Sequence, residues 1–184
     1  MLENWVVTPT CLPVVLRRCH TCGAERFRAD GKFRVNAHHK LLDAWLLVLC
    51  TDCGATVKLA VLERVNVRSV RAGLLERLHD NDPALAAELL GDPVVRRRNR
   101  IGLDWDGAWR LDTGGGGHRH PDREAVDVEV RFGAPIPVRP VRLIAEGFGL
   151  SRAGVERLIT EGNLVSAVRL TGKLSSGFTF TLKR

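Results

Sequence analysis

Two short cysteine pairs constrain the fold of this chain more than any other feature of its sequence. Each pair has the form C-x-x-C-G, and the motifs end at Gly23 and Gly54. A two-residue gap lets one tight turn direct both sulfur atoms at a single ion, and the glycine allows the backbone to fold back around that ion. The sequence therefore predicts one zinc ion bound by four thiolates, those of Cys19, Cys22, Cys50 and Cys53.

A zinc ion held by four cysteines has no open position for water or substrate, so we expect a structural rather than a catalytic ion. The residues alone leave two alternatives open, namely two independent redox C-x-x-C motifs or four buried thiols. The 27 residues between the pairs exceed the usual 15 to 20 of such sites, and a β-hairpin can fill the difference. Cys11 is interpreted as a small buried hydrophobic residue, with a fifth ligand as the alternative.

Composition and charge set the class of protein. A chain of 184 residues with 45% hydrophobic residues is expected to fold into one large or two small globular domains. It has no apolar run near 18 residues, so we expect no membrane span. Metal-binding cysteines without an apolar segment behind a basic start indicate the cytoplasm. The net charge of +7 favours a polyanionic partner such as nucleic acid.

Strand patterns surround the cysteine pairs. Residues 25–28 and 32–37 flank Asp30-Gly31, a dipeptide typical of a hairpin turn. An apolar run at residues 44–49 leads into the second pair, and residues 56–65 leave it with alternating apolar side chains. Together these segments predict a three- or four-stranded antiparallel ribbon held by zinc.

The middle of the chain shows helix signals. Apolar residues recur at helical spacing over residues 67–78, which predicts an amphipathic helix. Asp82-Pro83 and Asp92-Pro93 each combine a capping residue with a first-turn proline, so each predicts the start of a short helix. The last of these helices carries the arginines of residues 96–100, which could grip phosphates or form a solvated helix face.

The predicted fold class is α+β, with an N-terminal antiparallel β zinc ribbon, short helices in the middle and a small C-terminal α/β module. Four glycines at residues 114–117 break all periodicity and indicate a flexible linker. After it, the patterns predict a strand at residues 125–132, two helices and two further strands. The predicted boundaries are a zinc-ribbon domain at 1–66, a helical segment and Trp-rich connection at 67–112, the linker at 113–124 and the C-terminal module at 125–184.

The C-terminal module carries a recognisable order of short motifs. Arg139 opens it, Ser151-Arg152 starts a helix, and the Leu-Ile-x-x-Gly of residues 158–162 precedes terminal strands. This order resembles the small RNA-binding domain of ribosomal small-subunit protein four, which also occurs in pseudouridine synthases and bacterial heat-shock RNA-binding proteins. Pro140 and Val141 replace the family's opening leucine and aspartate, and its Val-Asn-Gly turn is absent. The resemblance implies that RNA phosphates contact Arg139, Arg152 and Arg157, with Arg142, Arg169 and Lys173 as neighbours.

A second resemblance extends over the whole chain. It is carried by Arg18-Cys19 with Cys22, by the Lys-Phe-Arg-Val-Asn-Ala of residues 32–37, by residues 40–46, by Cys50 with Cys53 and by residues 150–152. On these residues the chain resembles an uncharacterised bacterial family, described only as a domain of unknown function, with a four-cysteine N-terminal zinc ribbon. That family brings no activity with it.

These observations predict a non-enzymatic, zinc-stabilised protein that binds structured RNA, associated with ribosomal or transfer RNA. The alternative is a protein-interaction or DNA-linked regulatory adaptor built on a structural zinc ribbon. The nucleophile-elbow, zincin, Walker and dinucleotide motifs are absent, which disfavours an enzyme without deciding the question. The carboxylates to inspect first for a cleft are Asp43, Asp104, Asp106 and Asp112.

Overall fold

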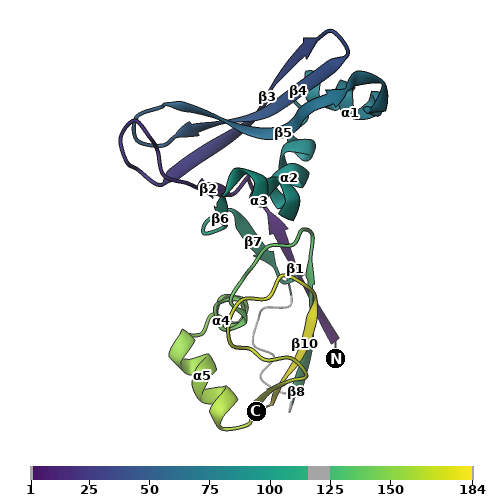
Figure 1. Cartoon of the computed structure of the whole chain (residues 1–184). Coiled ribbons are helices and arrows are strands. Elements are labelled where there is room, and N and C mark those ends of the chain that lie inside the picture. Colours follow the sequence, from purple (N-terminus) through teal and green to yellow (C-terminus); the bar gives the residue numbers. More distant parts are fainter. Residues whose placement is uncertain (1, 116–124, 184) are drawn as a thin grey trace. The chain divides into compact units, whose positions relative to one another are not determined.

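The computed structural model describes residues 2–115 and 125–183, and it shows a mixed α+β protein with two five-stranded sheets. The chain folds as two compact units (Figure 1). Leu12–Asp104 forms the cysteine unit, and Met1–Cys11 together with Trp105–Arg184 forms the terminal unit. The cysteine unit is therefore inserted in sequence between two parts of the terminal unit. Within the described ranges, no helix is long and apolar enough to cross a membrane.

The cysteine unit contains an antiparallel sheet in the order β5-β4-β3-β2-β6. The pattern at residues 44–49 lies within β4, and the one at residues 56–65 lies within β5, so both strand predictions are confirmed. The strands are β2 (Val14–Leu16), β3 (Arg26–His38), β4 (Leu41–Cys50), β5 (Thr56–Asn66) and β6 (Gly102–Asp104).

Three short helices follow β5, after a 3-10 turn η1 (Val67–Ser69). They are α1 (Ala72–His79), α2 (Pro83–Gly91) and α3 (Pro93–Asn99). The Asp82 side chain accepts a hydrogen bond from the Ala84 N–H at 2.8 Å, and Asp92 accepts one from the Val94 N–H at 2.7 Å. The two predicted caps are therefore confirmed, while the helix predicted over residues 67–78 begins only at Ala72.

The predicted hairpin at Asp30-Gly31 is wrong, because β3 continues through it and pairs with β4 on both sides. The ladder register shifts between Ala29 and Phe33, and Gly31 has a φ of 75°. One class of β-bulge places a glycine in the left-handed backbone region, as a hairpin turn does. Asn81 holds this bulge, since its Oδ1 accepts a hydrogen bond from the Phe33 N–H at 2.7 Å. The actual reversal between β3 and β4 lies at residues 39–40.

One face of this sheet packs against α1 and α2 to form the core of the cysteine unit. Its buried side chains come from alternate strand positions and from the facing sides of the helices, and include Phe27, Leu46, Val48, Leu59, Leu78, Leu85 and Leu90. At the sheet edge, α3 is fastened to β5 by Asn99, which accepts from the Ala60 N–H at 2.7 Å and donates to the Ala60 carbonyl at 2.9 Å. In the arginine run, Arg98 donates to the Val61 carbonyl, so this residue has a structural partner.

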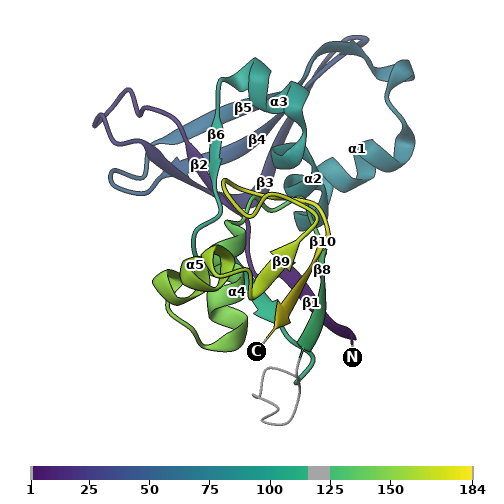
Figure 2. The ribbon, with the colours of Figure 1, turned by 90° about the horizontal axis from the view of Figure 1, so that it is seen from below.

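The terminal unit contains a sheet in the order β7-β1-β8-β10-β9, with α4 and α5 packed together against it (Figure 1, Figure 2). The predicted strand at residues 125–132 is confirmed as β8. The elements are β1 (Leu2–Pro9), β7 (Trp109–Asp112), β8 (Ala125–Phe132), α4 (Pro140–Phe148), α5 (Arg152–Thr160), β9 (Leu164–Ser166) and β10 (Phe178–Lys183).

The two units differ from the predicted domain boundaries. Residues 1–66 do not form one domain, because β1 pairs with β7 and β8 in the terminal unit. The segment 67–112 is also divided, since α1 to α3 and β6 belong to the cysteine unit and β7 belongs to the terminal unit. The sequence of β1 does not show the usual alternation of apolar and polar residues, because the charged Glu3 lies on the buried face with Trp5 and Val7.

The predicted linker at 113–124 joins two strands of one sheet. Its residues 116–124 lie outside the described residues, but β7 before it and β8 after it both flank β1. The tract therefore does not separate an N-terminal domain from a C-terminal one.

Cutting this connection is expected to leave the two fragments associated. A protease recognition sequence inserted after Gly115 would place β1 and β7 on one fragment and β8 on the other, and six register pairs from Leu2↔Asp127 to Val7↔Phe132 would still join them. Size-exclusion chromatography of the cleaved protein should give one peak in native buffer and two in denaturant. Two peaks in native buffer would contradict the pairing of β1 with β8.

Candidate functional site

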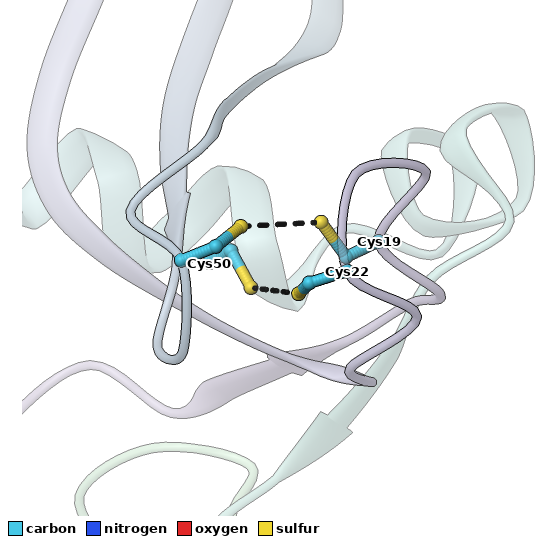
Figure 3. A group of neighbouring side chains, drawn as sticks. Cys19, Cys22 and Cys50 are labelled. Carbon is cyan, nitrogen blue, oxygen red and sulfur yellow. Dashed lines mark hydrogen bonds between the residues drawn. The ribbon is translucent and has the colours of Figure 1, made fainter.

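The four cysteines lie in two turns at one end of the cysteine unit's sheet. Cys19 and Cys22 lie in the connection from β2 to β3, while Cys50 ends β4 and Cys53 follows in the connection to β5. The antiparallel ladder pairs Cys50 with Phe27 near the start of β3, so the two turns meet. Figure 3 shows the sulfur atoms of Cys19, Cys22 and Cys50 turned toward the space between the turns.

The two turns share one backbone design. The Gly23 N–H donates to the Cys19 carbonyl and the Gly54 N–H to the Cys50 carbonyl, each at 3.0 Å. Each first cysteine also donates its own N–H to the alanine carbonyl five residues later. Gly23 and Gly54 have φ values of 80° and 71°, which only glycine adopts readily. The prediction that glycine lets the backbone fold back at each turn is confirmed.

The sulfur atoms have the spacing of a tetrahedral metal site. The Cys19 and Cys53 sulfurs are 3.8 Å apart, those of Cys22 and Cys50 are 3.6 Å apart, and all four lie within 4.8 Å of one another. A tetrahedron with a zinc–sulfur distance of about 2.3 Å has edges of about 3.8 Å. All four cysteines are free thiols. They form one cluster that could hold a metal ion, rather than two separate redox pairs.

The pKa values of Cys19 and Cys22 are shifted in opposite directions. Cys19 and Cys50 are 2% and 3% exposed, while Cys22 and Cys53 are exposed. Hydrogen bonds from the backbone N–H groups of Cys22 and Thr21 lower the pKa of Cys19 to about 6. For Cys22, the Ala24 N–H lowers the pKa, but the Cys53 sulfur and burial outweigh it and raise the pKa to about 12. A bound cation would stabilise the thiolate forms of Cys19 and Cys22 together, and would therefore lower the pKa of both thiols.

Cys11 does not belong to the cluster. It follows β1 at the point where the chain leaves the terminal unit, and its side chain is exposed. The interpretation of Cys11 as a buried hydrophobic residue is therefore wrong, because the position lies beyond the end of the strand. Among the residues that the structure describes, the metal-ligand cluster contains only the four predicted cysteines.

The terminal unit has a hollow of ≈ 980 Å³ between the start of α4, one side of α5, β9 and the loop after β9. We call this the cationic hollow, because five of the six sequence-predicted cations line it and the only acidic residue in its lining is Glu156. Arg157 is absent from the lining. The five cations are Arg139, Arg142, Arg152, Arg169 and Lys173.

Local structure fixes where these cations lie. Ser151 accepts a hydrogen bond from the Gly154 N–H at 3.0 Å, which confirms the predicted cap and places Arg152 at the start of α5. Arg142 forms an ion pair with Asp106, and its guanidinium carbon lies 5.3 Å from the centre of the Trp109 ring. Arg142 is therefore held from two sides. The other four cations form no ion pair with a residue in the described part of the chain.

The four carboxylates singled out from the sequence have structural partners. Asp43 accepts a hydrogen bond from the Arg64 N–H, and Asp112 accepts one from the Gly114 N–H. Asp104 forms an ion pair with Arg26, as Asp106 does with Arg142. Asp43 and Asp104 belong to the cysteine unit, and the other two to the terminal unit. The structure does not bring the four together within either unit.

Comparison with known proteins identifies a family. A search of curated proteins and a search of solved structures each returned no match. A protein-family model described as "Protein of unknown function (DUF1062)" matches residues 35–170, which is more than half of the chain. The match begins after the first cysteine pair, and it includes the second pair and every cation of the hollow except Lys173. The chain therefore belongs to the DUF1062 family of proteins of unknown function.

Proposed function

We propose that this protein is a non-enzymatic, zinc-stabilised protein that binds structured RNA, such as ribosomal or transfer RNA. In this proposal the cysteine unit is a scaffold built around a zinc ion. Four thiolates are the ligand set of structural zinc sites, and soft sulfur ligands select zinc over magnesium or calcium. The sulfur separations of 3.6 Å and 3.8 Å support this choice, because they match the edges of a zinc–thiolate tetrahedron.

The observation that carries RNA binding is the gathering of five cations in the cationic hollow of the terminal unit. Elements far apart in sequence supply them, from Arg139 before α4 to Lys173 after β9. With one acidic residue in the lining, this concentration of positive charge is suited to phosphate groups. Structured RNA is bound largely through its phosphates and its shape, which requires cations rather than exposed aromatic rings.

The start of α4 supports an anionic ligand independently. Arg139 is the N-cap of this nine-residue helix, and its side chain makes no capping hydrogen bond. The first N–H groups of a helix have no partner within the helix and carry a partial positive charge. Val141 and Arg142 from this first turn line the hollow. A phosphate in the hollow could accept hydrogen bonds from these backbone groups.

We expect Arg152→Ala to flatten the salt dependence of RNA binding. Each lost phosphate contact reduces the slope of log affinity against log salt by about one, with little change in sequence preference. The measurement is fluorescence anisotropy with a labelled RNA hairpin at several salt concentrations. Arg157→Ala is the matched control, because it removes the same charge from the same helix outside the hollow, so its slope should stay closer to that of the unaltered protein.

Two results would count against this proposal. One is an Arg152→Ala variant whose slope equals that of the unaltered protein. The other is a protein that binds neither hairpin RNA nor ribosomal RNA at low salt. In either case the alternative function, a protein-interaction or DNA-linked regulatory adaptor, becomes the better proposal.

The outer face of the cysteine unit's sheet favours that second candidate function. On β4, the side opposite the helices carries the half-buried Trp45, Leu47 and Leu49. The Lys58 ammonium lies 5.2 Å from the centre of the Trp45 ring. A protein partner that packs on these side chains would bind with a weak salt dependence, because apolar contacts release few counterions.

A further inference from the structure

We propose that the cationic hollow receives a single unpaired nucleotide of the RNA, with its base against the apolar residues of the lining and its phosphates at the cations. This inference rests on the proposed function and specifies which part of a structured RNA the site recognises. A duplex or hairpin stem alone would then be an incomplete ligand.

The lining of the hollow contains apolar residues beyond the cations that phosphate binding requires. Ile159, Leu164 and Leu170 form part of the lining, together with Val165 and Val168. Val165 is 47% exposed and Val168 is 39% exposed. Exposed apolar side chains are ordinary when they are scattered, but grouped in a concave surface they indicate a ligand with an apolar face. The flat face of a nucleobase has this character.

The shape of the hollow also favours a single inserted group. Its volume of ≈ 980 Å³ falls within the range of about 300–1,000 Å³ of pockets that take small organic ligands. The phosphate backbone of a stem is a convex surface that lies across a protein face. A base that has left the stack can instead enter a pocket and lie between apolar side chains.

The arrangement of charge is consistent with this orientation. Arg139, Arg152 and Arg169 come from three different segments around the hollow, and their side chains are exposed. A guanidinium can bind a phosphate or stack its plane on a base. Taking a base out of a helix costs least where it is already unpaired. The preferred ligand is therefore a stem with a bulged or overhanging nucleotide.

The test compares three RNA hairpins that share one stem. One has a blunt end, one has a single-nucleotide bulge, and one has a single overhanging 3′ nucleotide. Fluorescence anisotropy with the full chain should show at least about fivefold tighter binding to one or both hairpins with an unpaired nucleotide, because the base buries apolar surface against the lining. Val168→Ser should abolish this preference by weakening binding to the hairpins with an unpaired nucleotide more than binding to the blunt hairpin. Val94→Ser is the control, since Val94 is 59% exposed and lies in the cysteine unit, and it should keep the preference.

Each outcome of this test is decisive. Equal affinity for the three hairpins, with a steep salt dependence, overturns the inference but leaves RNA binding intact. Equal weakening of all three by Val168→Ser also overturns it. If Val168→Ser does not fold, Val165→Thr answers the same question, because threonine keeps the branched shape on β9. Failure of every hairpin to bind at low salt removes both proposals. If cytidine monophosphate binds while no hairpin does, the ligand is a free nucleotide and the RNA assignment is overturned.

Discussion

Replacing Cys50 with serine is expected to remove the bound metal and to unfold the scaffold around it. Cys50 ends β4, is 3% exposed and belongs to the apolar core of the cysteine unit together with Cys19. Serine has no thiolate, so a four-sulfur site becomes an incomplete one. The free energy of binding a structural zinc ion is folding free energy, on the order of 10 kcal/mol or more. A unit of this size cannot lose that much and stay folded.

The measurements are elemental analysis, thermal melting and hydrogen exchange. The unaltered protein should carry one zinc per chain, while the Cys50→Ser variant should carry almost none and lose protection in β3, β4 and β5. Cys11→Ser is the matched control, because it makes the same atomic change at an exposed cysteine outside the cluster. It should keep both the metal and the melting temperature. A metal-free protein with unchanged melting would falsify the scaffold role.

Features that depend on sequence neighbours could be predicted. Asp82, Asp92 and Ser151 each cap a helix whose first residues follow directly, so residue type and spacing are sufficient. The cysteine cluster is predictable for the same reason, since each half of the site is a single turn. The two turns come together only in the folded sheet, where the antiparallel pairing of β3 with β4 places them side by side.

Features that depend on distant contacts could not be predicted. Gly31 has the same φ sign in a hairpin turn and in a bulge, and the choice is made by Asn81, which lies 50 positions later in the chain. The strand β1 was missed because Glu3 interrupts its apolar face. The Glu3 carboxylate is buried next to Trp5, whose Nε1 donates a hydrogen bond to it at 3.2 Å.

The cationic hollow shows an intermediate case. A resemblance suggested six cations, and the structure gathers five of them without Arg157. The helical spacing of α5 could have predicted that Arg157 and Arg152 lie on different sides of the helix. At about 100° per residue, Glu156 and Ile159 lie within about 40° of Arg152 around α5, while Arg157 lies about 140° away from it. The valines of the lining follow no such rule, because Val168 lies in a loop.

Replacing Trp5 with alanine is expected to destabilise the terminal unit by about 3–5 kcal/mol. Trp5 is fully buried on β1, which lies between β7 and β8 in the sheet. Its ring centre lies 4.9 Å from that of Phe148 on α4 and 5.6 Å from that of Phe180 on β10. A Cβ atom added to Gly147 would approach the ring to 2.2 Å. The helix thus rests directly on the indole, and alanine would leave a cavity between α4 and the sheet.

Two further variants separate the packing of Trp5 from its hydrogen bond. Trp5→Phe keeps an aromatic ring but leaves the buried Glu3 carboxylate without its indole partner, a loss of about 1–3 kcal/mol. Leu2→Ala is the control on the same strand, because Leu2 is 55% exposed, and its effect should stay within about 0.5 kcal/mol. Urea denaturation with hydrogen exchange should rank the destabilisation as Trp5→Ala, then Trp5→Phe, then Leu2→Ala, with protection lost in α4 and β8. Equal stability of Trp5→Ala and Leu2→Ala would mean that β1 contributes no core to this sheet, and the assignment of the N-terminal segment to the terminal unit would then be wrong.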